Sequence, residues 1–309
     1  MPTFATPGPV AATVEVAGAR VRVSASDRTD TVVLVEPIDG TSRKDVRVAE
    51  RTKVDLADGR LSVRTTASGD RKGSVAITID LPTGSGLAAY LAHSDVRADG
   101  FLGRCELHMA SGQVQLDHID TLRADVASGE VAIGHIAGRA DIDGGAFAIR
   151  IGEVEGPVGL SNSGGRAWIG HAAADVELSS ATCDFDIDRA DGSVAAKSAS
   201  GAIRIGRMTD GRATLTNGSG NIEVGIGAGA AASIDVNSER GRSATPSRRT
   251  EAPTRRTARS RSTRVPGTAT SSSGARQVEP QRASVTSTSV AALAGVPSSV
   301  TSANRVSPR

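Results

Sequence analysis

Four stretches of this sequence share one phrase. They read SGQVQL (residues 111–116), SGEVAI (128–133), SGAIRI (200–205) and SGNIEV (219–224). Weaker copies lie outside and between them, anchored at Ser94, Phe147, Gly165 and Cys183. Successive anchors lie about 18 residues apart, which is typical of a repeat architecture.

Two columns of the repeat are almost purely aliphatic. Two places after the anchor stand Val96, Val114, Val131, Ile149, Ala167, Phe185, Ile203 and Ile222. Four places after it stand Ala98, Leu116, Ile133, Ile151, Ile169, Ile187, Ile205 and Val224. The position between the two columns is mostly polar, so each unit contains a short strand that points two side chains inward. A second apolar pair follows in each unit and indicates a second strand.

These columns predict the fold class. No unit shows an apolar period of 3.6 residues, which excludes helical and leucine-rich repeats. We therefore expect an all-β protein, a single-chain β-solenoid like a parallel β-helix, whose coils of about 18 residues stack about 4.8 Å apart. One coil cannot bury its own apolar side chains, so the coils fold only as a stack.

Composition divides the chain into four predicted segments. Residues 1–9 are expected to be disordered. Residues 10–86 alternate apolar and polar side chains, including the short alternating stretch 46–48, and predict a cap of antiparallel strands over the first coil. Residues 87–240 hold the solenoid repeats, and residues 241–309 form a disordered tail rich in Arg, Ser, Thr and Pro.

The net charge of +2 conceals a difference between the tail and the rest of the chain. Residues 243–309 hold 11 Arg and two Glu, a net +9, so residues 1–242 hold 25 basic against 32 acidic residues, a net −7. One hypothesis makes the tail an arm that binds nucleic acid or anionic lipid by charge alone. The favoured hypothesis is a one-nucleotide frameshift near Arg242, because the shifted frame at residues 265–273 permits another strand phrase of the repeat.

Two polar columns carry the candidate site residues. At plus five stand the residues predicted to form structural corners with positive φ, namely Gly134, Gly152, Gly170 and Gly206. At plus six stand His118, His135 and Glu153, which stacking would place on successive coils as potential metal ligands. The column continues with His171 and two arginines, which favours an exposed polar ladder without metal.

Catalysis has no positive signal in the sequence. We find no nucleophile elbow, zinc-protease motif, phosphate-binding loop or dinucleotide-binding motif. Outward carboxylates such as Asp184 and Asp186 leave a carbohydrate-active or carbohydrate-binding β-helix as an alternative. Against this alternative, aromatic side chains that could stack on sugars are scarce, because Trp168 is the one Trp and Tyr90 the one Tyr of the chain.

The Ser-Gly phrase, the Gly- and Val-rich coils and the strand-rich N-terminal segment resemble the bacterial "putative adhesin" family of β-strand-repeat domains of unknown function. The resemblance covers about residues 10–240 and implies a β-solenoid with an adhesive or scaffolding role and no catalytic residues. We therefore predict a non-enzymatic scaffold or adhesin-like binding surface that needs no cofactor, with an unknown protein partner or with self-association through the solenoid ends. The N-terminus has no apolar core of a secretion signal, and no apolar run is long enough to span a membrane, so we expect a cytoplasmic protein.

Overall fold

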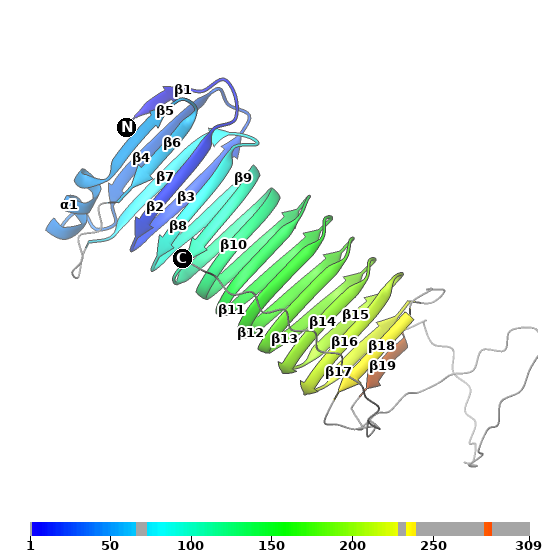
Figure 1. The fold of residues 1–309 in the computed structure, drawn as a ribbon. Coiled ribbons are helices and arrows are strands. Elements are labelled where there is room, and N and C mark those ends of the chain that lie inside the picture. The colour runs from blue at the N-terminus through cyan, green and yellow to red at the C-terminus, as the bar shows by residue number, and fades with distance from the viewer. Residues whose placement is uncertain (1, 66–72, 228–232, 239–280, 286–309) are drawn as a thin grey trace, which may run out of the picture.

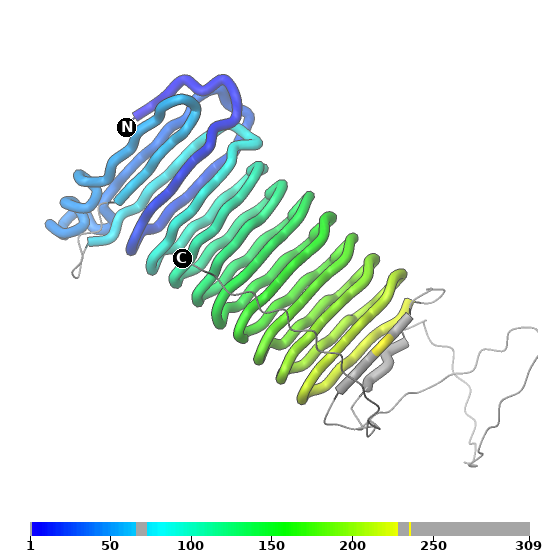
Figure 2. The backbone as a smooth tube through the Cα atoms, in the orientation of Figure 1, coloured from blue at the N-terminus to red at the C-terminus, as the bar shows by residue number. Residues whose placement is uncertain are grey.

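The computed structural model describes residues 2–65, 73–227, 233–238 and 281–285. In these residues the strands stack side by side along one axis, and from residue 94 the chain advances one coil at a time (Figure 1; Figure 2). The coils form a β-solenoid of about eight turns, so the predicted fold class is confirmed.

Ten strands build the repeat region. They are β9 (Ser94–Met109), β10 (Gly112–Ile136), β11 (Ala140–Val154), β12 (Val158–Ala172), β13 (Val176–Ala190), β14 (Val194–Ser200), β15 (Ile203–Met208), β16 (Arg212–Ser219), β17 (Ile222–Ile226) and β18 (Ser233–Ser238). Neighbouring coils pair in parallel, with Val131 opposite Ile149 and Ile149 opposite Ala167. Like residues of successive coils therefore stack, as the repeat predicts.

The two predicted aliphatic columns form the core. Every member of both columns is buried, and they belong to one continuous hydrophobic cluster that also includes the N-terminal strands. Each buried Val, Ile or Leu contributes roughly 1.5–3 kcal/mol relative to an exposed one. The small aliphatic side chains suit the narrow interior, in which Phe147 and Phe185 are the buried aromatics among the described residues.

The N-terminal segment departs from prediction in the direction of its strands. β2 (Ala11–Ala17) and β3 (Ala19–Ser26) form a coil that lies between two others. On one side are β6 (Arg60–Arg64) and β7 (Val75–Pro82), and on the other are β8 (Gly86–Ala92) and β9. All four pairings are parallel, so the expectation of antiparallel strands is wrong here. Alternation fixes which side chains face inward but says nothing about the direction of the partner strand.

In the described part of the chain, antiparallel pairing is confined to strands near the two ends of the solenoid. At the N-terminal end, β4 (Asp30–Pro37) pairs with β1 (Thr3–Ala5) and with β7, and β5 (Lys53–Ala57) pairs with β6. Strand β1 corrects the expectation that residues 1–9 are disordered. At the other end, β19 (Gln281–Val285) pairs antiparallel with β17. The rest of the predicted tail, with the site of the frameshift hypothesis, lies outside the described residues.

A helix replaces the strand expected at residues 46–48. α1 spans Arg43–Arg51, and its N-cap Ser42 accepts a hydrogen bond from the backbone N–H of Asp45. The Ser42 hydroxyl also donates to the Asp45 carboxylate, which makes a local cap of the kind that begins helices. α1, the one helix within the described residues, is too short and too polar to cross a membrane.

Candidate functional site

One face of the solenoid carries a groove lined by polar side chains. Strands β7, β3, β9 and β10 lie side by side there, with Ile77, Val21, Val96 and Val114 in register and buried beneath them. Because side chains alternate along a strand, the residues before and after each of these point to solvent. The order of these strands in the sheet differs from their order in the sequence.

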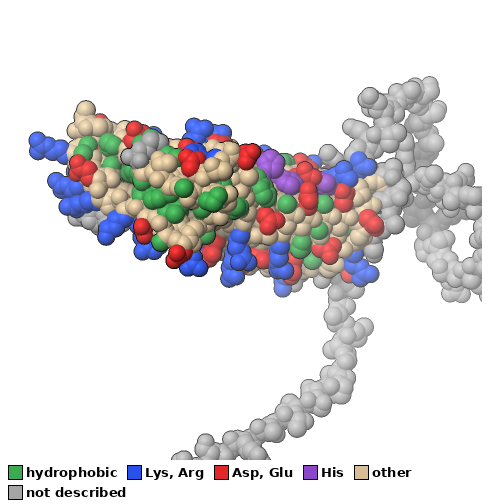
Figure 3. All heavy atoms as spheres, turned by 90° about the horizontal axis from the view of Figure 1, so that it is seen from above, with side chains coloured by type: hydrophobic (Ala, Val, Ile, Leu, Met, Phe, Trp, Pro, Cys, Tyr) green, Lys and Arg blue, Asp and Glu red, His purple; other side chains and the backbone are tan. Residues whose placement is uncertain are grey.

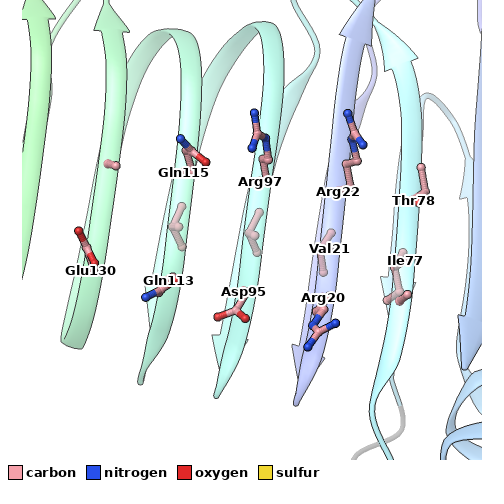
Figure 4. Close-up of a pocket in the computed structure, with 14 residues that line it drawn as sticks. Arg20, Val21, Arg22, Ile77, Thr78, Asp95, Arg97, Gln113, Gln115 and Glu130 are labelled. Carbon is pink, nitrogen blue, oxygen red and sulfur yellow. The ribbon is translucent and has the colours of Figure 1, made fainter. Parts of the chain in front are cut away.

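The first hollow of this groove has a volume of about 510 Å³. Its outward-facing lining residues are Arg20, Arg22, Ala76, Thr78, Asp95, Arg97, Gln113, Gln115, Glu130 and Ala132. Figure 4 shows that the long polar side chains stand on the same side of adjacent strands. The hollow forms at Ala76 and Ala132, because their side chains are shorter than the polar side chains around them.

A second hollow, of about 290 Å³, continues the first along the same face. The two share Arg97, Gln115 and Ala132. The second is also lined by Asp99, Asp117, Gly134, Arg150, Gly152 and Trp168. The guanidinium carbon of Arg150 lies 4.6 Å from the centroid of the Trp168 ring, a cation–π contact. We call the two hollows together the polar groove.

The polar groove is electrically balanced. Its charged side chains are Arg20, Arg22, Arg97 and Arg150, and Asp95, Asp99, Asp117 and Glu130. Four positive charges thus face four negative charges. Asp99 accepts from Arg97 at 3.1 Å and lies 3.5 Å from Arg22, so part of this charge is paired within the groove.

Several groove side chains have no partner among the residues that the structure describes. Within the described part of the chain, Arg20, Asp95, Gln113, Gln115 and Glu130 form no side-chain hydrogen bond or ion pair. The two amides offer donors and acceptors, the carboxylates accept, and the guanidinium donates. Their side chains are therefore free to bind a polar ligand.

The predicted corner glycines contribute to this groove for a reason other than backbone φ. None of Gly134, Gly152, Gly170 and Gly206 has a positive φ, so that part of the prediction is wrong. A Cβ at Gly134 would lie 2.6 Å from the carbonyl oxygen of Asp117 on the preceding coil, and one at Gly170 would lie 3.0 Å from the Trp168 ring. The missing side chains let coils approach closely and leave Gly134 and Gly152 as the floor of the second hollow.

Positive φ occurs instead at the anchors of the repeat. Gly112, Gly129, Gly165, Gly201 and Gly220 have φ between +114° and +134°. Glycine is the residue that adopts such angles at little cost. The parallel pairs fall into two rows, one through β7, β3 and β9 and one through β6, β2 and β8, and we call these rows the two sheets of the solenoid.

The column of His118, His135 and Glu153 stacks from coil to coil, with His135 opposite Glu153, and we call it the histidine edge. Histidine side chains, purple in Figure 3, gather along one edge of that view. The rings of His118 and His135 are 5.3 Å apart, centroid to centroid. Their nitrogens turn to different acids, however: His118 Nδ1 lies 3.1 Å from Asp117, and His135 Nε2 lies 3.2 Å from Glu155. Among the described residues, no three His, Cys, Asp or Glu side chains are placed to hold a metal ion.

Glu153 instead pairs with the next histidine of the same column. Its carboxylate lies 3.0 Å from Nδ1 of His171, whose Nε2 lies 2.8 Å from Asp191. The hydrogen bond that His171 donates to Asp191 raises the pKa of His171, and the bond to Glu153 adds to the effect. Hydrogen bonds from Arg189, Thr209 and His171 hold the pKa of Asp191 well below its ordinary value. The histidine edge thus links successive coils by charge.

The sequence contains a signal for this network in the spacing of its Arg and Asp residues. Arg and Asp recur two places apart, and in a strand such residues lie on one face. Four of these pairs form ion pairs, at 2.7–3.1 Å: Arg28–Asp30, Arg97–Asp99, Arg139–Asp141 and Arg189–Asp191. Asp191 was therefore identifiable as the partner of Arg189.

The carboxylates that suggested a carbohydrate-active site form hydrogen bonds to the neighbouring coil. Asp184 accepts a hydrogen bond from the backbone N–H of Ala202 at 2.9 Å. Asp186 accepts from Arg204 at 2.6 Å, and Arg204 also reaches Asp188 at 3.4 Å. These contacts explain both carboxylates as coil-to-coil ties.

The repeat geometry agrees with a known family. A family model described as Toastrack DUF4097 matches residues 12–279. The chain belongs to the Toastrack DUF4097 family. This match confirms the resemblance drawn from the Ser-Gly phrase to β-strand-repeat domains of unknown function.

Solved structures of similar proteins come from bacteria. A "putative adhesin" from Parabacteroides distasonis is 13% identical, with a TM-score of 0.42, and the match covers 77% of this chain and 95% of that one. A "putative adhesin" from Parabacteroides merdae is 10% identical, with the same TM-score and coverage. A "putative lipid binding protein" from P. distasonis is 11% identical, with a TM-score of 0.36 and coverage of 77% and 96%. A search of curated proteins finds no match.

Proposed function

We propose that this Toastrack protein is a non-enzymatic, adhesin-like binding protein and that the polar groove is its contact surface. The observation that carries the proposal is the set of unpaired donors and acceptors, among them Gln113 and Gln115, on the outer face of a parallel sheet. The backbone of that sheet is held by coils on both sides, so the side chains that meet a bound partner project from fixed backbone positions. The expected cytoplasmic location and self-association through the solenoid ends stay predictions.

Outside the polar groove, the titratable side chains favour a structural role over a catalytic one. The carboxylates and imidazoles with clear partners, such as Asp186, His171 and Asp191, are bound to neighbouring coils. General acid–base catalysis needs a group that is free to exchange a proton with a substrate. These side chains hold neighbouring coils together.

Filling the polar groove tests the proposal. Ala132 is half-buried, points outward and lines both hollows, so Ala132→Trp occupies the groove without removing a polar group. Ala88 is a half-buried outward alanine on the opposite sheet, away from both hollows, and Ala88→Trp is the matched control.

The measurement is cosedimentation of purified protein with the washed insoluble fraction of the source cells. We expect the wild type and Ala88→Trp to cosediment and Ala132→Trp to bind at least tenfold more weakly. Equal binding by Ala132→Trp refutes the groove as the contact surface. Continuous release of soluble products from the insoluble fraction refutes the non-enzymatic assignment.

A further inference from the structure

The polar groove is long and crosses the strands along the solenoid axis. Its central row begins at Thr78 on β7 and ends at Trp168 on β12, with Arg22, Arg97, Gln115 and Ala132 among the residues between. This row spans six strand spacings of about 4.8 Å, or about 29 Å. A groove of this length and openness fits an extended chain better than a compact small molecule, which is bound in a deep pocket.

The balance of charge argues for an uncharged chain. The groove has four arginines and four carboxylates, and Asp99 already neutralises Arg22 and Arg97 in part. A polyanion such as nucleic acid is bound by surfaces with an excess of Lys and Arg, which neutralise several phosphates at once. The polar groove has no such excess.

The free hydrogen-bonding groups argue for a ligand that donates and accepts along its whole length. Arg20 donates only, Asp95 and Glu130 accept only, and Gln113 and Gln115 do both. A hydroxyl group donates one hydrogen bond and accepts two, so a chain of hydroxylated units can satisfy all of these side chains. An apolar ligand would leave the same groups buried without partners, at a large cost.

A peptide fits this surface less well. Extended peptides are bound mainly by adding a strand to an open sheet edge, where the backbone groups are unpaired. The polar groove lies on the face of the sheet, where the strands on both sides have used the backbone donors and acceptors. Trp168, half-buried at one end of the row, adds apolar ring surface of the kind that packs against the C–H groups of a sugar.

We propose that the polar groove binds a linear, uncharged polysaccharide that lies along the solenoid axis. This inference rests on the proposed function and names its ligand class. Gln113 and Gln115 hydrogen-bond to sugar hydroxyls, and the part of the Trp168 ring that Arg150 leaves uncovered contacts the carbon face of a sugar ring.

The test is affinity electrophoresis in native gels that contain one polysaccharide each. The neutral probes are laminarin, hydroxyethylcellulose and dextran, and the acidic probe is polygalacturonate. Gln113→Ala/Gln115→Ala removes the free amides without changing charge. Ser161→Ala/Thr214→Ala is the matched control, because both residues are exposed and polar and lie on the opposite sheet. Unchanged circular dichroism and thermal unfolding establish that each variant is folded.

We expect at least one neutral polysaccharide to retard the wild type and the control, with an apparent Kd at least tenfold higher for the glutamine variant. The retardation should persist at about 0.5 M salt, where exposed charges are strongly screened. Retardation by polygalacturonate alone, by no probe, or equally for the glutamine variant overturns the proposal. If Ala132→Trp still abolishes cosedimentation in that case, the binding function stands and only the ligand class is wrong.

Discussion

Two glycines of one coil differ in what they require, and exchanging each for alanine measures the difference. Gly201 is an anchor with φ +124°, and a Cβ there would overlap the carbonyl oxygen of Cys183 on the preceding coil. Gly206 has no positive φ, and its Cβ would lie 2.8 Å from the carbonyl oxygen of Asp188. Both therefore meet the backbone of the preceding coil, but only Gly201 also needs a conformation that alanine avoids.

The magnitudes follow from these two terms. A non-glycine residue in such a backbone region costs about 1–3 kcal/mol. At Gly201 the overlap with Cys183 must also displace the backbone and weaken a coil-to-coil hydrogen bond, about 1 kcal/mol more. We expect Gly201→Ala to lower the free energy of unfolding by about 3 kcal/mol. At Gly206 the lower entropy of the unfolded alanine chain returns about 0.4–1 kcal/mol, so we expect a net loss of about 1 kcal/mol or less.

Thermal unfolding followed by far-UV circular dichroism checks this order. At roughly 2–4 °C per kcal/mol, Gly201→Ala should lower Tm by about 6–12 °C and Gly206→Ala by no more than about 4 °C. Gly8→Ala is the control, because Gly8 has ordinary φ and a Cβ there meets no atom within 4 Å. A Gly206→Ala variant that is as unstable as Gly201→Ala would refute the assignment of the backbone requirement to the anchor column.

Two other predictions concern titratable groups. The raised pKa of His171 means that its protonated form stabilises the fold fully below its unfolded pKa of about 6.5, and that this contribution is lost as pH rises through the folded pKa. The Tm difference between the wild type and His171→Gln should therefore be larger at about pH 5.5 than at about pH 8.5, and a constant difference would contradict the network with Asp191. Burial raises the pKa of the Cys105 thiol to about 12, so a disulfide reagent at neutral pH should label Cys105 only after unfolding, and rapid labelling of the native protein would contradict its buried position.

The repeat region could be predicted from sequence because each inference needed only the pattern within one coil. Val114 and Leu116 recur as aliphatic residues in every unit, and the same spacing that reveals them also fixes which residues stack. The anchor glycines were visible too, but the turn was assigned to the column that begins with Gly134. Both columns are rich in small residues, and composition alone does not separate a glycine that needs positive φ from one that needs close approach.

The same pattern could not predict how the N-terminal coils pair or that a helix forms among them. Alternation in β2 and β3 predicted strands correctly but could not show that they pair in parallel with strands from both later segments. At residues 46–48 the apolar spacing of two fits a strand, whereas the cap formed by Ser42 and Asp45 begins a helix. Ser42 and Asp45 are close in sequence, so the helix could have been predicted from this cap.

The polar groove depends on this insertion of the N-terminal coil. Arg20 and Arg22 enter the sheet between Thr78 and Arg97 because β3 pairs with both β7 and β9. Read in sequence, the outward Arg, Gln and Asp residues of each strand look like an ordinary solvated face, because their neighbours in the sheet come from segments far apart in the chain. The first hollow takes its shape only after that order is set, since Ala76 is low relative to the longer Arg20 and Arg22 side chains that the inserted coil brings beside β7. It follows that ligand binding should depend on the correct placement of β3, and that a chain whose later coils fold normally while β3 is displaced would keep its solenoid and lose its site.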